Sequence, residues 1–203
     1  MDEFKVREWL LDQTTMRLFR NGFDGLTMDS VAEDAGISKK TLYRLVPSKA
    51  DLLKMVIGRQ IESVEKKMKV ILANPHMNFQ EKLDGMLREA SEVLSRLPRN
   101  TPRQIMKMGP DVWEMLRSRR ASLLDIIVEL LVEGREIGMI RKDLPPAFLA
   151  KSLHTMIDTM LTPQMAVESG LGLTELLNLT LKMMYGGILT DLGCRTTIVS
   201  EQT

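Results

Sequence analysis

The amino-acid sequence predicts an all-α fold, with a small N-terminal helix-turn-helix domain followed by a larger helical domain. Apolar residues recur at steps of three and four along most of the chain, as at Leu53, Ile57 and Ile61, which is the spacing of one helical face. No segment alternates apolar and polar residues as a half-buried strand does. Residues 27–49 contain two short helical patterns joined by a glycine, which predicts the helix-turn-helix.

The segment 27–49 has start and stop signals for two short helices. Thr27 suits the start of the first helix because its hydroxyl can accept a backbone N–H of the first turn. Gly36 suits its end because glycine adopts the left-handed conformation without a steric penalty. Ser38 can cap a second helix, which Pro47 ends. Two helices joined by a glycine-containing turn form the plan of a DNA-binding helix-turn-helix.

Positive charge gathers on the second of these helices. The 203-residue chain has a formal net charge of +1, which by itself says nothing about nucleic acid. Residues 36–50, however, hold four basic side chains and no acidic one. Because phosphates respond to such a local field, the second helix is predicted to enter the major groove of DNA.

The rest of the chain is predicted to be a succession of helices. One helix over residues 3–20 completes the N-terminal domain, and a long one over 49–73 joins it to the second part. Further helical patterns cover residues 79–97, 102–108, 111–116, 123–137, 143–160 and 174 onward. The expected organisation is a DNA-binding domain at 1–48, a helical domain at 49–193 and a loose tail at 194–203.

The last two predicted helices carry more apolar residues than one buried face needs. A helix that is apolar beyond one stripe is buried on more than one side. Two such helices from each of two chains can form a four-helix bundle across a two-fold axis, so a homodimer is predicted, with a well-buried monomer core as the alternative. The expected interface residues are Leu149, Leu153, Ile157, Leu177, Leu181, Met184 and Ile188.

Composition argues against several classes of function. Cys194, the single cysteine, forms no internal disulfide, and the acidic start of the chain differs from a secretory signal, so a cytoplasmic protein is expected. No apolar run is long enough to span a membrane. The two histidines, His76 and His154, stand without a metal-ligand cluster, a nucleophile motif or a phosphate-binding loop. The sequence therefore predicts neither an enzyme nor a bound metal or cofactor.

The segment from about Leu11 to Leu53 closely resembles the N-terminal domain of the TetR (tetracycline-repressor) family of bacterial transcriptional regulators. Order and spacing match over about a fifth of the chain. The resemblance implies a helix-turn-helix domain plus a C-terminal ligand-binding and dimerisation domain, in about nine helices. The matching positions are Leu18-Phe19, Gly22-Phe23, Thr27, Val31-Ala32, Ala35-Gly36-Ile37-Ser38-Lys39, Thr41-Leu42-Tyr43, Ser48-Lys49 and Leu52-Leu53.

The resemblance also implies how the N-terminal domain docks on DNA. Thr27 and Lys49, at helix N-termini, and the hydroxyl of Tyr43 are expected to hold phosphates. Other side chains are expected to reach base edges, where Lys or Arg on guanine is the commonest specific contact. These are Ser38, Lys39, Lys40, Thr41 and Arg44. The alternative for this face is a solvated charged surface.

In the family a small molecule binds among the C-terminal helices and changes the spacing of the two recognition helices. The resemblance thus implies a ligand-responsive regulator, usually a repressor, that binds a palindromic operator as a dimer. Twelve of the sixteen methionines lie from Met68 onward. Because methionine adapts to varied apolar shapes, a hydrophobic effector is expected, although methionine also fills gaps in cores. The expected ligand residues are Met86, Met106, Met108, Trp113, Leu116, His154, Met156, Asp158 and Met160.

Two rival functions stay open from the sequence. One is a DNA-binding regulator that responds to no ligand. The other is a helical scaffold whose C-terminal domain binds a protein partner. Binding to no DNA duplex at low salt would favour the scaffold. The expected partners of the main hypothesis are double-stranded DNA, a second copy of the chain and a small-molecule effector, with no membrane.

Overall fold

The computed structural model describes residues 3–107 and 110–190, apart from the side chains of residues 110, 111 and 113. In this part the chain forms ten helices and no strand, which confirms the all-α prediction. The helices are α1 (Glu3–Asn21), α2 (Met28–Ala35), α3 (Lys39–Leu45), α4 (Lys49–Leu72), α5 (Phe79–Ser95), α6 (Thr101–Met106), α7 (Pro110–Glu136), α8 (Pro146–Met160), α9 (Pro163–Ser169) and α10 (Leu173–Ile188).

The helices differ from the predicted ones in two places. The patterns predicted separately at 111–116 and 123–137 form one continuous helix, α7, because no glycine or proline lies between them. The seven-residue α9 was not predicted, since it is too short to show an apolar stripe. It begins where the Thr162 hydroxyl accepts the Met165 N–H. The predicted tail at 194–203 lies outside the described residues.

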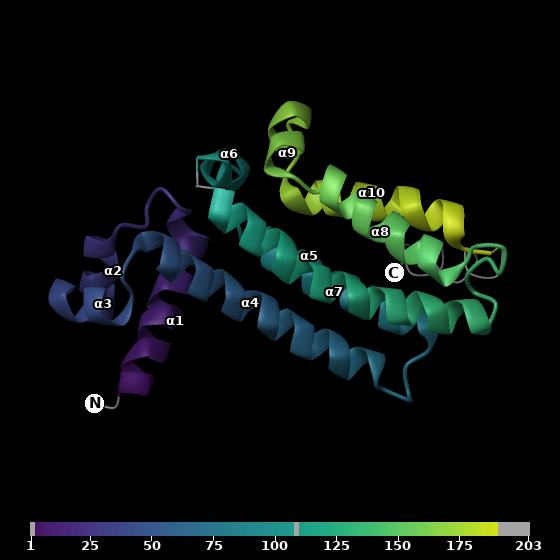
Figure 1. Cartoon of the computed structure of the whole chain (residues 1–203), viewed down its shortest axis with the longest axis horizontal. Helices are drawn as coiled ribbons and strands as arrows, with labels where there is room; N and C mark the ends of the chain where they lie inside the picture. Colours follow the sequence, from purple (N-terminus) through teal and green to yellow (C-terminus); the bar gives the residue numbers. More distant parts are fainter. Residues whose placement is uncertain (1–2, 108–109, 191–203) are drawn as a thin grey trace.

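The N-terminal domain packs α1, α2 and α3 around a small apolar core. Leu10, Leu26 and Leu42 are fully buried there. The first half of α4 closes this core with Leu52 and Val56, so α4 belongs to the domain's interior for about half of its length. This arrangement holds α3 at one end of the molecule, with its outer face in solvent (Figure 1).

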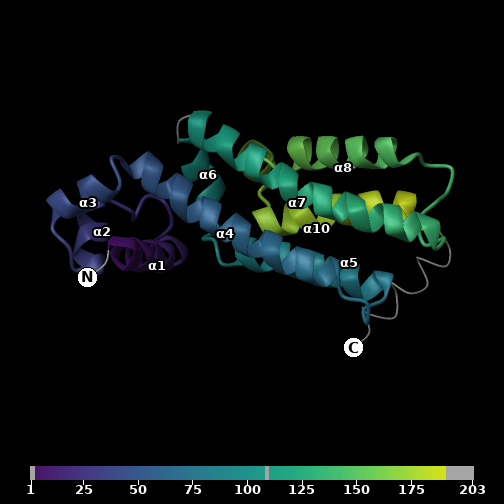
Figure 2. The same ribbon diagram turned by 60° about the horizontal axis from the view of Figure 1, so that its bottom comes forward.

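The second half of α4 enters a bundle with α5, α7, α8 and α10. Helix α4 packs along α5 and α7, while α8 and α10 pack on each other and on α7 and α5 respectively. Figure 2 shows the bundle extending away from the N-terminal domain. A second apolar core, around Met68, Met86 and Leu130, fills it. Among the described helices, none combines the length and the apolar character that a membrane crossing requires.

The structure corrects the residues expected at the dimer interface. All seven lie in the core of the single chain and are at most 9% exposed, because α8 and α10 turn their apolar stripes toward their own bundle. The outward sides of these two helices carry other apolar residues. The exposed ones are Phe148 on α8 and Leu179 and Met183 on α10.

Candidate DNA interface and effector cavity

Local hydrogen bonds fix the start and the end of α2. The Thr27 hydroxyl accepts the Ser30 N–H, and the Ser30 hydroxyl accepts the Thr27 N–H, both at 3.1 Å. Gly36 ends the helix with a φ of 66°, a left-handed conformation that other residues adopt with strain. These two ends set the direction in which the chain enters α3.

The second helix of the motif, α3, is anchored on one side and exposed on the other. The Ser38 hydroxyl accepts the Thr41 N–H at 3.1 Å and lies 2.9 Å from the Thr41 hydroxyl. Leu42 is fully buried and holds α3 against the core. The predicted basic face is therefore on the surface, where the exposed side chains are Lys39, Lys40, Tyr43 and Arg44.

Two of the predicted DNA-binding cations already have partners within the chain. Lys39 Nζ lies 2.8 Å from the Asp29 carboxylate, and this hydrogen bond raises the pKa of Lys39. Lys49 Nζ donates to the Phe23 carbonyl at 2.9 Å. Because Lys39 and Asp29 are both exposed, exchange of Asp29 for a DNA group costs little. Lys49 is half-buried, so it also supports the loop before α2.

A charged pair attaches α2 to α1. Arg17 donates from Nε and Nη2 to the two carboxylate oxygens of Asp34, with Nη2 at 2.8 Å from Oδ1. The fork of the guanidinium matches a carboxylate in this way. The hydrogen bonds from Arg17 lower the pKa of Asp34. The pair thus helps to hold the helix-turn-helix rigidly on α1.

A buried glutamine of α6 holds the loop between α1 and α2. Gln104 Oε1 accepts the Phe23 N–H at 2.8 Å, and its Nε2 donates to the Asp24 carboxylate at 3.1 Å. Gln104 is only 4% exposed. A Cβ atom at Gly22 would lie 2.6 Å from Oε1, so glycine permits this close approach. No sequence motif predicts this link, which joins α6 directly to the DNA-binding domain.

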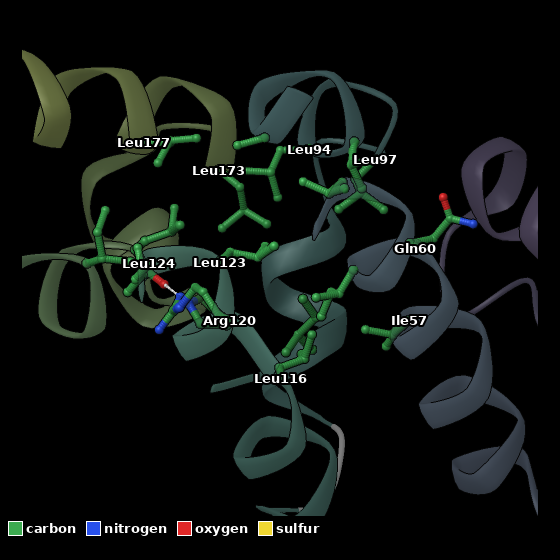
Figure 3. A pocket seen from close by; sticks show the side chains of 18 of the residues that line it. Ile57, Gln60, Leu94, Leu97, Leu116, Arg120, Leu123, Leu124, Leu173 and Leu177 are labelled. Atoms are coloured by element: carbon green, nitrogen blue, oxygen red, sulfur yellow. Dashed lines mark hydrogen bonds between the residues drawn. The ribbon is translucent and has the colours of Figure 1, made fainter. Parts of the chain in front are cut away.

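An apolar cavity of about 220 Å³ lies where the N-terminal domain meets the bundle. Phe19 and Phe23 line it from the N-terminal domain, and Ile57 and Ile61 line it from α4. Helices α5, α6, α7 and α10 and the corner between α8 and α9 contribute the rest (Figure 3). All of its lining residues are apolar except Gln60 and Arg120.

Most of the predicted ligand residues lie elsewhere. Leu116 lines the cavity. Met86 is buried in the bundle core, and Met106 is exposed on α6. Met156 and Met160 do not line the cavity. Met108 and the side chain of Trp113 lie outside the described part.

The two polar residues expected at the ligand site, both on α8, each contact a side chain of α7. His154 Nε2 lies 3.0 Å from the Asp125 carboxylate, away from the cavity lining. Asp158 does not line the cavity either, but its Oδ1 accepts from Nη2 of Arg120 at 2.7 Å. Asp158 therefore contacts the lining through Arg120.

The cavity uses residues that the sequence had assigned to the dimer. Ile157, Leu177 and Leu181 line it, together with a face of α7 that carries Leu123 and Ile127. The prediction of the ligand-binding residues relied largely on methionine as a residue type. The signal that leads to the cavity is instead the apolar stripes of α8 and α10, which face the interior of the bundle.

Comparisons with known proteins identify the N-terminal segment. Residues 10–56 match the family described as bacterial regulatory proteins, tetR family. The chain is 25% identical over 177 residues to the uncharacterized HTH-type transcriptional regulator YvaF of Bacillus subtilis (strain 168), covering 87% of this chain and 93% of YvaF. It is 30% identical over 92 residues to the HTH-type transcriptional repressor KstR of Rhodococcus jostii (strain RHA1), covering 45% of this chain and 42% of KstR.

The fold is also similar to that of known regulators. The crystal structure of the transcriptional regulator FadR from Bacillus subtilis in complex with stearoyl-CoA aligns with a TM-score of 0.63 and 19% identity, covering 89% of this chain and 98% of FadR. This likeness extends from the helix-turn-helix into the bundle. Residues 10–56 therefore match the tetR family of bacterial regulatory proteins, and the curated relatives that the chain resembles are described as HTH-type transcriptional regulators.

Proposed function

We propose that the chain is a ligand-responsive transcriptional repressor, which binds a palindromic operator as a homodimer and is released by a hydrophobic effector. The observation that carries this proposal is the apolar cavity, whose walls come from both α1 and the bundle. A ligand that favours one arrangement of these walls also changes the affinity for DNA, since the two binding free energies are coupled. A fold similar to this one holds stearoyl-CoA in FadR, which supports a long apolar effector.

The proposed DNA contacts divide into phosphate and base contacts. Thr27, Tyr43 and Lys49 hold phosphates and fix the orientation of the domain. Lys40 and Arg44, whose exposed side chains have no ion pair among the described residues, read base edges in the major groove. Lys39 joins them after it leaves Asp29. Ser38 and Thr41 support both sets from the first turn of α3.

The proposed dimer uses the outward faces of α8 and α10. Leu179, Met183 and Gly186 follow one another at steps of four and three on α10 and are exposed. A Cβ atom at Gly186 or Gly187 would meet nothing within 4 Å, so a second helix can approach closely here. Phe148 extends this apolar face on α8. A two-fold axis through it would present two recognition helices to successive major grooves, about 34 Å apart.

The coupling between effector and DNA is proposed to pass through α6. Ile105 of α6 lines the cavity, and Gln104 beside it holds the Phe23 and Asp24 loop. A ligand that displaces Ile105 therefore also moves the loop that precedes α2.

A DNA titration tests the proposal. Fluorescence anisotropy with a labelled fragment from immediately upstream of the gene, at several salt concentrations, is compared with scrambled DNA. Specific and steeply salt-dependent binding is expected. Tyr43→Ala should weaken binding to both DNAs alike, whereas Arg44→Ala should also reduce the preference for the specific fragment. Binding of the unaltered protein to neither DNA at low salt would contradict the repressor and favour the scaffold.

A further inference from the structure

We propose that the effector is an alkyl carboxylate, whose anionic group binds Arg120 in exchange for Asp158. This inference rests on the proposed function, because it names the chemical class of the ligand that the cavity takes. Its basis is the contrast between an almost entirely apolar lining and one cation. Among the described residues, Arg120 is the single charged one that lines the cavity.

Arg120 is held at the cavity wall by contacts on its α8 side. Its Nη2 donates to the Asp158 carboxylate at 2.7 Å, and its Nη1 donates to the Leu161 carbonyl at 3.0 Å. Figure 3 shows the guanidinium among apolar side chains of the cavity, with the bond to Leu161 drawn as a dashed line. The cation therefore faces both the apolar space and the end of α8.

The two partners of the ion pair differ in their contact with water. The Arg120 side chain is 17% exposed and that of Asp158 is 40% exposed. Asp158 can therefore be hydrated when it leaves the pair, whereas an unpaired Arg120 would be a costly buried charge. A ligand carboxylate removes this cost because it replaces one anion by another. Its planar group also matches the guanidinium in a bidentate contact.

The cavity selects the rest of the ligand by its size and its polarity. Burial of an alkyl chain against the leucines and isoleucines is favourable in proportion to its area. The volume of about 220 Å³ exceeds the roughly 150 Å³ of an apolar cavity that holds benzene, so it has room for an alkyl chain. An amine on this chain would be repelled by Arg120, and an alcohol would gain no charge contact.

The exchange has a route to the DNA-binding domain. Leu161 follows α8 as its C-cap, Pro163 begins α9, and both residues line the cavity. Helix α9 packs against α6, which holds the loop before α2 through Gln104. A ligand that takes Arg120 from Asp158 thus changes the attachment of α8 next to the corner that contacts α6.

The test is a calorimetric titration of the full-length protein with decanoate, decanol and decanoyl-CoA. Decanoate is expected to bind about tenfold or more tightly than decanol, the size of a charged hydrogen bond. Arg120→Gln should remove this difference, because the ligand carboxylate loses its cationic partner. Asp158→Asn, which removes the competing anion, should strengthen the binding of decanoate but not that of decanol. Arg119→Gln is the matched control, because the neighbouring Arg119 pairs with Glu62 on the surface and does not line the cavity.

Three results would overturn the inference: equal affinities for decanoate and decanol, binding of decanoyl-CoA alone with no effect of Arg120→Gln, or no binding of any of the three. Operator binding, measured on the same preparations, separates this failure from that of the proposed function. Retained operator binding without decanoate binding rejects the alkyl carboxylate and keeps the regulator. Asp158→Asn keeps the test decisive should Arg120→Gln fail to fold.

Discussion

The N-terminal domain and the bundle differ in how completely their interiors are filled. Leu10, Leu26 and Leu42 are fully buried in the small N-terminal core. The bundle has a larger core, yet it leaves an apolar cavity where it meets α1. Close packing resists deformation, so the first region suits a fixed recognition surface. The second region has space that a ligand can fill, so its helices suit a site whose arrangement changes on binding.

The same contrast appears at the helix ends. Helices α2, α3 and α4 each begin with a side chain that accepts a backbone N–H of the first turn, from Thr27, Ser38 and Ser48 respectively. Helices α6 and α8, at the cavity, begin without such a bond. A missing cap typically costs about 1 kcal/mol. Helices α6 and α8 are therefore less firmly anchored at their starts than the helices of the recognition motif.

The largest expected effect comes from emptying the filled core. Leu42→Ala should lower the free energy of unfolding by about 2–5 kcal/mol, because Leu42 is fully buried. Leu94→Ala, at the half-buried lining of the cavity, should cost only about 1 kcal/mol, because its side chain already borders empty space. Urea unfolding of the two variants measures the difference. Equal losses would show that the two interiors are equally well packed.

The link between the two regions is the next target. Gln104→Ala leaves the buried Phe23 N–H without its acceptor, which should cost about 1–3 kcal/mol of stability. It should also make DNA affinity less sensitive to the effector, since the direct contact between α6 and the loop is lost. Anisotropy titrations with and without decanoate measure this sensitivity. Arg103→Ala, an exposed change on the same helix, is the control, and an unchanged sensitivity in Gln104→Ala would remove Gln104 from the coupling.

The two regions also differed in how far the sequence could predict them. The ends of α2 and α3 followed from Thr27, Gly36 and Ser38, because capping depends on residues within one turn. The apolar stripes of α8 and α10 are buried as predicted, but the further apolar residues Phe148, Leu179 and Met183 are exposed in the single chain. The sequence could not tell whether a second chain or the same chain covers each of them, because that depends on how distant helices pack.

The cavity was beyond the sequence for the same reason. Its lining joins α1, α4, α7 and α10, and no short-range pattern says which faces of these helices meet. Arg120 and Gln104 illustrate the limit, since each is one polar residue on a helix with many others. Arg120 is important because of the apolar cavity around it, and Gln104 because of the buried loop beside it.

The ion pair between Arg17 and Asp34, which joins α1 and α2, makes the stability of the N-terminal domain depend on pH. Asp34 has its pKa lowered from the ordinary value of 3.8 by the hydrogen bonds from Arg17. The pair therefore contributes stability above that pH, which is lost as the pH falls through the lowered pKa. The contribution should be below about 1 kcal/mol, because both side chains are partly exposed. In urea unfolding, Arg17→Gln should lose less free energy of unfolding than the unaltered protein between about pH 6 and pH 3. An identical loss would show that the Arg17–Asp34 pair is not the source of this pH dependence.

The smallest expected effect tests whether the bundle also tolerates imperfect polar contacts. The Tyr185 hydroxyl is buried on α10 and has no hydrogen-bond partner among the described residues, and burial raises its pKa. By contrast, the Thr14 hydroxyl in the N-terminal core donates to the Leu10 carbonyl at 2.7 Å. Tyr185→Phe removes a hydroxyl without a partner, so it should leave the free energy of unfolding unchanged or raise it by up to about 1 kcal/mol.

Thr180→Val on the same helix is the matched control. The Thr180 hydroxyl is buried but donates to the Leu176 carbonyl at 2.7 Å, so its loss should give no gain. Thermal unfolding of the two variants and of Thr14→Val compares the regions directly. A clear destabilisation by Tyr185→Phe would mean that its hydroxyl has a partner, such as a buried water. The Tyr185 hydroxyl would then be hydrogen-bonded like that of Thr14 in the N-terminal core. Buried hydroxyl groups would no longer distinguish the two regions, whereas the cavity still would.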